Sequence, residues 1–171
     1  MEIQIIRSPK RKRSISARMV GDMMRVNAPA NMPGPELQEI VNNFQRRFEK
    51  RKLKKELNKQ ENLMDICQKL NQEYFWGQIE VKSIEYSTDQ TAKWGVCNHK
   101  NKTILISHRL AGFPNWVRDY VIVHEMVHIL HPDHSKRFWK KVRRYRLSER
   151  ARGYLIAKGL EDTDESDIDQ M

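Results

Sequence analysis

The segment HEMVHILHPDH, residues 124–134, holds four of the six histidines of this 171-residue chain. It overlaps an apolar-periodic stretch at 117–130, VRDYVIVHEMVHIL, and is interrupted by Pro132. This periodicity predicts a helix that ends before the proline. His124 and His128 are four residues apart, so on a helix their imidazoles lie on one face, one turn above the other. The two side chains can therefore share one metal ion.

Glu125 completes an H-E-x-x-H arrangement, the pattern found in zinc hydrolases. From its place on the helix it can reach a water on the ion without binding the ion itself. A catalytic zinc ion leaves its fourth position to water and lowers the pKa of that water towards ~7. Glu125 would then take the proton of the water as it attacks a carbonyl and pass it to the leaving amine.

A third protein ligand must come from a part of the chain that has reversed direction. His134 lies beyond the break at Pro132 and can return over the site, so we favour it. His131 is one turn past His128, too far along the helix axis to join the pair, and is expected to support a ligand or form the pocket wall. The sequence thus predicts one Zn²⁺ per chain, bound by His124, His128 and His134.

The remaining patterns predict an α+β chain with a single domain over residues 1–160. We divide this domain into a β-rich part, a helical part and a catalytic core, at residues 1–35, 36–76 and 77–150. In the first part, 2–6 and 15–27 alternate like strands and predict a β-hairpin or meander. In the second, apolar residues step by three and four from Glu36, which predicts a long basic helix.

The catalytic core contains further predicted elements around the histidine segment. Residues 79–86 and 103–108 have the pattern of strands, joined by a loop at 91–101, and another helix starts near Ser135. The last eleven residues, 161–171, carry six acids and no lysine or arginine. Such a composition is typical of an acidic disordered tail.

The chain is basic, with 32 lysines and arginines against 22 acids and a net charge of +10. Without the acidic tail the charge of residues 1–160 is +16, gathered in clusters at 7–13, 46–59 and 136–152. These clusters favour a nucleic-acid or nucleotide partner, although no aromatic residues interleave them and no binding residues can be named. The oligomeric state is not determined by the sequence.

Several features bear on the compartment of the protein. Only two cysteines, Cys67 and Cys97, are present, which excludes a disulfide scaffold and fits a reducing environment. No apolar run approaches the ~20 residues of a membrane-spanning helix. The first residues lack the charged-then-apolar order of a secretory signal. We therefore expect a cytoplasmic protein with no membrane association.

Three blocks of sequence resemble the YgjP-like metallopeptidases, which are similar in turn to the SprT-like and WLM zinc peptidases. The blocks are WGVCN at 94–98, KTILISHRL at 102–110 and DYVIVHEMVHILHPDHSKRFWKKV at 119–142. The resemblance is close over roughly 63–147. It implies a zincin-like α+β fold, in which a small antiparallel or mixed sheet packs on the H-E-x-x-H helix and a second helix forms a wall. It also implies zinc ligands at His124, His128 and His134, with Glu125 as the catalytic base.

The resemblance further implies that the strand at 103–108, or its neighbour, borders the cleft. An extended substrate could add there as another strand. The chain departs from the commoner family wording at Lys93, where the family has arginine, so a bidentate contact would be lost. Lys93, Trp94 and His108 are therefore candidates for the cleft. A metzincin is excluded because no Met-turn follows the motif. Cys97 and His99 are not favoured as a nucleophile pair, since alternate residues on an extended loop point apart.

The main functional hypothesis is a zinc metallopeptidase that acts on a peptide or protein through a Glu125-activated, zinc-bound water. A second hypothesis keeps the metal but changes the substrate. The basic clusters could serve a metal-dependent nucleotide phosphohydrolase (a pyrophosphatase), or an SprT-like protease associated with nucleic acid. A third is a latent or non-catalytic zinc protein, blocked by its own N-terminal segment or acidic tail.

Overall fold

The computed structural model describes residues 2–159 of the chain, so the predicted tail at 161–171 lies outside the described residues. Contacts divide the chain into two compact units, Met1–Lys52 and Leu53–Met171, which we call the N-terminal and C-terminal units. Each has its own hydrophobic core. Helix α1, Gly34–Gln60, contributes residues to both units. Within residues 2–159, every helix is too short or too polar to span a bilayer.

The N-terminal unit contains a three-stranded sheet of β1 (Glu2–Ser8), β2 (Ser16–Val20) and β3 (Met23–Pro29), in the order β1-β3-β2. Strands β2 and β3 form an antiparallel hairpin, whose turn contains Gly21 at a φ of 61°. A two-residue hairpin turn favours glycine at such a position. Strand β1 pairs with β3 in parallel.

The predicted β-hairpin is present, although residues 2–6 are not one of its two strands. The hairpin lies inside the 15–27 segment, and β1 and β2 are not neighbours. The connection between β1 and β2 is long enough to leave a place between them for β3. Strand β3 is the central strand, where neighbours on both sides allow its inward side chains to be fully buried. These side chains are Met24, Val26 and Ala28. The first half of α1 covers this face with Leu37 and Val41.

The C-terminal unit contains a second sheet, of β4 (Ser83–Ser87), β5 (Gly95–Asn98) and β6 (Thr103–Ser107), in the order β4-β6-β5. Strand β4 runs parallel to β6 and β5 runs antiparallel to it. The strands expected at 79–86 and 103–108 correspond to β4 and β6. Strand β5 was not predicted, because it is only four residues long and lies inside the segment interpreted as a loop.

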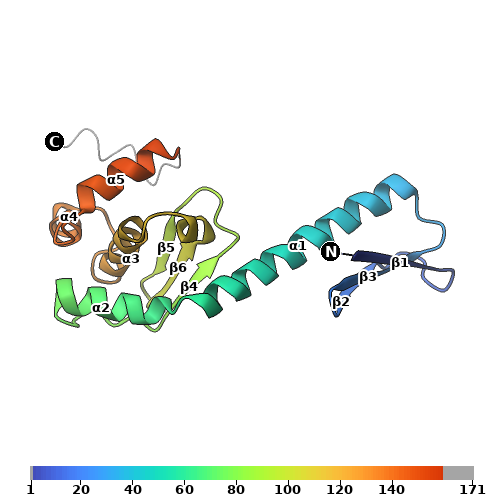
Figure 1. The fold of residues 1–171 in the computed structure, drawn as a ribbon, viewed down its shortest axis with the longest axis horizontal. Helices are drawn as coiled ribbons and strands as arrows, with labels where there is room; N and C mark the ends of the chain where they lie inside the picture. Colours follow the sequence, from blue (N-terminus) through green and yellow to red (C-terminus); the bar gives the residue numbers. More distant parts are fainter. Residues whose placement is uncertain (1, 160–171) are drawn as a thin grey trace. The chain divides into compact units, whose positions relative to one another are not determined.

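Helix α3 (Asn115–Leu130) is the central helix of this unit (Figure 1). It packs against β5 and β6 and also contacts α2 (Leu63–Phe75), α4 (Lys136–Val142) and α5 (Ser148–Ala157). Because neighbours surround it, apolar residues occur on most of its sides rather than on one stripe. The predicted α+β class, with a small mixed sheet on the histidine-bearing helix, is confirmed. A short 3-10 helix, His108–Gly112, links β6 to α3.

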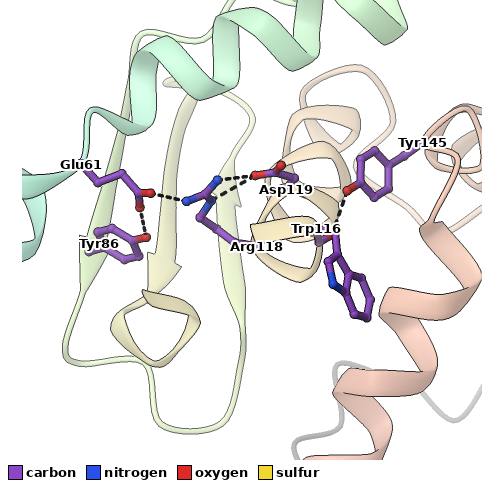
Figure 2. Close-up of polar contacts among 6 residues, drawn as sticks. All are labelled: Glu61, Tyr86, Trp116, Arg118, Asp119 and Tyr145. Atoms are coloured by element: carbon purple, nitrogen blue, oxygen red, sulfur yellow. Dashed lines mark hydrogen bonds and ion pairs between the residues drawn. The ribbon is translucent and has the colours of Figure 1, made fainter. Parts of the chain in front are cut away.

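A buried polar network ties the start of α3 to the sheet (Figure 2). The Arg118 guanidinium donates to Glu61, at the junction of α1 and α2, and to Asp119 at 2.7 Å. The other Glu61 oxygen accepts from the Tyr86 hydroxyl of β4. Only 7% of the Arg118 side chain is exposed. A buried charge needs such partners, so this network sets how α3 sits against the sheet.

Candidate metal centre

Three histidines converge at the C-terminal end of α3. His124 and His128 lie on the helix, and His134 follows it in the loop before α4. The Nε2 atom of His124 is 3.2 Å from that of His128 and 3.3 Å from that of His134. The ligand nitrogens of all three lie within 4.8 Å of one another. The helical spacing predicted from the sequence therefore brings the first two together, and the loop supplies the third.

The spacing of these nitrogens fits a tetrahedral ion. Zinc–nitrogen bonds of 2.0–2.1 Å at tetrahedral angles place two ligand nitrogens roughly 3.3 Å apart. The distances from His124 to His128 and His134, at 3.2 and 3.3 Å, agree with this value. Three imidazole donors also match the preference of zinc for nitrogen ligands. The three histidines can thus hold a metal ion of this kind.

The turn after α3 directs His134 towards the other two rings. His131 ends the helix in an extended conformation, and Pro132 cannot continue it. The His128 Nδ1 atom lies 3.2 Å from the His131 carbonyl oxygen, so an N–H at that position donates to it and leaves Nε2 facing the centre. His131 thus supports a ligand through its backbone. Its own Nε2 is buried and has no hydrogen-bond partner among residues 2–159.

His124 and His128 are held in the neutral form that a metal requires. Burial, followed by the charges of His128, His134 and Arg152, lowers the pKa of His124 well below 6.5. Burial and the charge of His134 lower the pKa of His128 to about 4. Both rings are therefore unprotonated near neutral pH, with lone pairs available for a metal.

Helix α4 forms an aromatic wall beside the three rings. The Phe138 ring is fully buried, and its centroid lies 4.8 Å from that of His124 and 4.5 Å from that of His128. Trp139 stacks on His134 at 5.7 Å. These contacts fix the orientation of the imidazoles and exclude water from one side, as the environment of a metal site must do.

Glu125 is buried beside the centre, with 4% of its surface exposed. Its side chain passes over Gly95, the first residue of β5. A Cβ added to Gly95 would lie 2.5 Å from Glu125 Oε1 and 2.7 Å from its Cγ. Glycine is therefore required at this position for the carboxylate to keep its place. Sequence reasoning did not assign Gly95 a role, although it stands in the WGVCN block that carries the family resemblance.

Of the other sequence candidates, Lys93 and Trp94 directly precede β5 and His108 directly follows β6. Lys93 is close enough for its charge to lower the pKa of His128. Trp94 is buried against Phe113, with Arg109 over its ring. His108 places its Nδ1 atom 3.3 Å from the carbonyl oxygen of Ser87 at the end of β4.

The Cys97 thiol does not have the character of a nucleophile. Burial, with a further contribution from the Glu125 charge, raises its pKa to about 12. A nucleophilic cysteine requires the thiolate, which is favoured by a lowered pKa. This agrees with the choice of the histidine cluster over Cys97 and His99.

The fold and the centre together define an α+β protein with a three-histidine site on an H-E-x-x-H helix. Residues 44–147 match the family model described as YgjP-like, metallopeptidase domain. This match covers more than half of the chain, and the chain belongs to the YgjP-like family. It confirms the resemblance seen in the sequence and extends it into α1. A search of curated proteins and a search of solved structures each found no match.

Proposed function

We propose that the protein is a zinc metallopeptidase with a zincin-like arrangement, in which Glu125 is the general base. The observation that carries this proposal is the buried Glu125 carboxylate, on the same helix and one residue from the first of three converging histidines. Membership of a metallopeptidase family supports it. One Zn²⁺ would be held by His124, His128 and His134 through their ring nitrogens.

A zinc ion held by these histidines would supply Lewis acidity towards the scissile carbonyl and a bound water. The residues of the chain do the remaining work. The Glu125 carboxylate accepts the proton of the attacking water and then delivers it to the leaving amine nitrogen. Gly95 leaves the space that the carboxylate occupies, and the wall of Phe138 and Trp139 keeps bulk water from one side of the histidines.

Strand β5 is the proposed docking edge for the substrate. It is an edge strand of the sheet β4-β6-β5 in the part of the chain that the structure describes. Its first residue, Gly95, contacts Glu125, and Val96 is 42% exposed. A peptide that paired with the outer edge of β5 would run past the carboxylate in an extended conformation, with its backbone hydrogen bonds satisfied.

The test combines metal analysis with a peptidase assay on the wild type and Glu125→Gln. We expect one zinc per chain in both proteins, and cleavage of an unfolded protein substrate by the wild type alone. Removal of a general base lowers the rate by about 10²–10⁴-fold. A variant that binds zinc and retains full activity would contradict the assignment of Glu125.

The same samples separate the proposal from its main rival. Pyrophosphate release from nucleoside triphosphates is measured beside peptide cleavage, with His134→Ala as the variant that loses a ligand. Peptide cleavage that is lost in His134→Ala supports the metallopeptidase. Phosphohydrolase activity without peptide cleavage would replace it with the nucleotide hypothesis.

A further inference from the structure

The outer face of the N-terminal sheet carries two arginines side by side. On β3 the residues Met24, Val26 and Ala28 face the core, so the alternating residues Arg25 and Asn27 face outwards. The strand register places Arg18 of β2 directly opposite Arg25. On its other side Arg25 is paired with Gln4 of β1, to which its Nε donates a hydrogen bond at 3.0 Å.

This arrangement is unfavourable for the sheet by itself. Like charges directly opposite each other on neighbouring strands are destabilising. No carboxylate among residues 2–159 forms an ion pair with Arg18 or Arg25, and Arg18 has no hydrogen-bond partner there either. Two guanidinium groups in register, that of Arg18 exposed and that of Arg25 half-buried, have no carboxylate partner among the described residues and form a site for an external anion.

The positive charge continues along the sheet towards the loop between β1 and β2. That loop contains Lys10, Arg11, Lys12 and Arg13. It leads into β2 at Ser16, which is paired with Asn27 of β3. In this loop the Arg11 amide donates to the carbonyl oxygen of Ser8, at the end of β1, at 3.3 Å, and the Arg11 guanidinium donates to Ser14 at 3.3 and 3.4 Å.

The acids of the sheet lie at its other end. Glu2 pairs with Met23 beside the hairpin turn, and Asp22 lies in that turn. The whole unit of residues 1–52 has twelve lysines and arginines and five acids, a net charge of +7. The face formed by Arg18, Arg25 and loop 9–15, which we call the basic face, is therefore the part of the sheet where cations are not offset by acids.

We propose that the basic face binds the phosphate backbone of nucleic acid without regard to base sequence. Guanidinium forks match phosphate oxygens in pairs, and a row of phosphates satisfies several cations at once. The two phenylalanines of this unit, Phe44 and Phe48, pack on its core, and the strands β1, β2 and β3 carry no aromatic residue. The face therefore lacks a stacking platform and reads the backbone rather than the bases.

The proposal is independent of the metal centre, and its test measures binding rather than cleavage. The zinc-loaded full-length chain is titrated into a labelled random-sequence duplex, and the fluorescence anisotropy is followed at several salt concentrations. We expect R18S/R25S to reduce affinity roughly tenfold or more at low salt and to lower the slope of log K against log salt by about 2. K136S/K140S, which removes two exposed charges from α4, is the matched control and should bind like the wild type.

A second variant, K10S/K12S, tests the loop without altering the strands, and a thermal melt of each variant checks folding. We expect R18S/R25S to fold, since it removes a repulsive pair. Unchanged duplex binding and salt slope in both variants would overturn the proposal, as would a loss confined to K136S/K140S. Equally tight binding to phosphatidylserine vesicles, abolished by the same changes, would assign the face to a membrane surface instead.

Discussion

At the residue scale, the position of the Glu125 carboxylate depends on the missing side chain of Gly95. The two residues lie on different elements, α3 and β5, and approach so closely that a methyl group at Gly95 would overlap the carboxylate. Close approach of this kind is one of the few reasons for which a strand requires glycine. In the proposed active site, the sheet therefore determines where the Glu125 carboxylate lies.

We therefore predict that Gly95→Ala impairs catalysis while leaving zinc in place. The alanine methyl displaces the Glu125 side chain, and a shift of ~1 Å at a catalytic group costs about a hundredfold in rate. Peptidase rates and zinc content of the purified variant check this. Gly112→Ala is the matched control, because a Cβ there meets nothing within 4 Å. Equal losses in both variants would mean that the effect does not come from Glu125.

The His128 side chain predicts a pH dependence for the zinc-free protein. Burial lowers its pKa to about 4 in the folded state, against 6.5 in the unfolded chain. Between these values the unfolded chain binds a proton that the folded chain does not, so the free energy of unfolding falls as the pH drops from about 6.5 to about 4. Above pH 6.5 His128 is unprotonated in both states, so the free energy of unfolding no longer changes with its titration.

Urea unfolding of the zinc-free wild type and His128→Gln across this pH range measures the effect. The slope of stability against pH should be smaller in the variant. Asp119, whose pKa burial raises, contributes with the opposite sign but is the same in both proteins. Identical slopes would show that His128 titrates normally in the folded state.

At the element scale, contacts of its first turns fix the position of α3. Arg118 links the α1–α2 junction to the start of α3 (Figure 2). Tyr145 adds a further link, since its hydroxyl donates to the Trp116 carbonyl oxygen at 2.9 Å. These contacts join segments that are far apart in the chain, and they orient the helix that carries His124 and His128.

We predict that Arg118→Met destabilises the protein by about 3 kcal/mol, because Glu61 and Asp119 lose their buried counter-charge. Lys54→Met is the control. This variant breaks the 3.0 Å ion pair between Lys54 and Glu85, whose side chains are 42% and 52% exposed respectively. Such pairs contribute at most about 1 kcal/mol. Chemical denaturation gives both values, and similar losses in the two variants would mean that the Arg118 network is no more important than a surface pair.

At the scale of the whole molecule, two units with separate cores share one chain. The metal centre belongs entirely to the C-terminal unit, and so do all four tryptophans, Trp76, Trp94, Trp116 and Trp139. The basic face belongs to the N-terminal unit. The candidate metal centre and the proposed nucleic-acid-binding face thus belong to different units.

We predict that zinc stabilises the C-terminal unit alone. A ligand present at 100 times its dissociation constant adds about 2.7 kcal/mol to the folded state that binds it. Tryptophan fluorescence reports the unfolding of this unit, whereas far-ultraviolet circular dichroism reports both. Zinc should raise the unfolding midpoint measured by fluorescence. The part of the dichroism transition that belongs to the N-terminal unit should not move. A chelator should reverse the fluorescence shift. A single transition that zinc moves as a whole would show that the units unfold together.

The sequence by itself determined the elements whose signals are local. Helical periodicity over neighbouring residues predicts the histidine helix, the proximity of His124 to His128 and the end of the helix before Pro132. The net charge and its clusters are equally independent of the fold. The family was recognisable from three short blocks.

The tertiary structure decided the contacts between distant segments. Strand β5, its approach to Glu125, the parallel pairing of β1 with β3 and the opposition of Arg18 and Arg25 all depend on strand order and register. A four-residue strand has too few residues to show an alternating pattern, and register is set by which side chains become buried together. Such burial is a property of the assembled core, so no local stretch of the chain contains it.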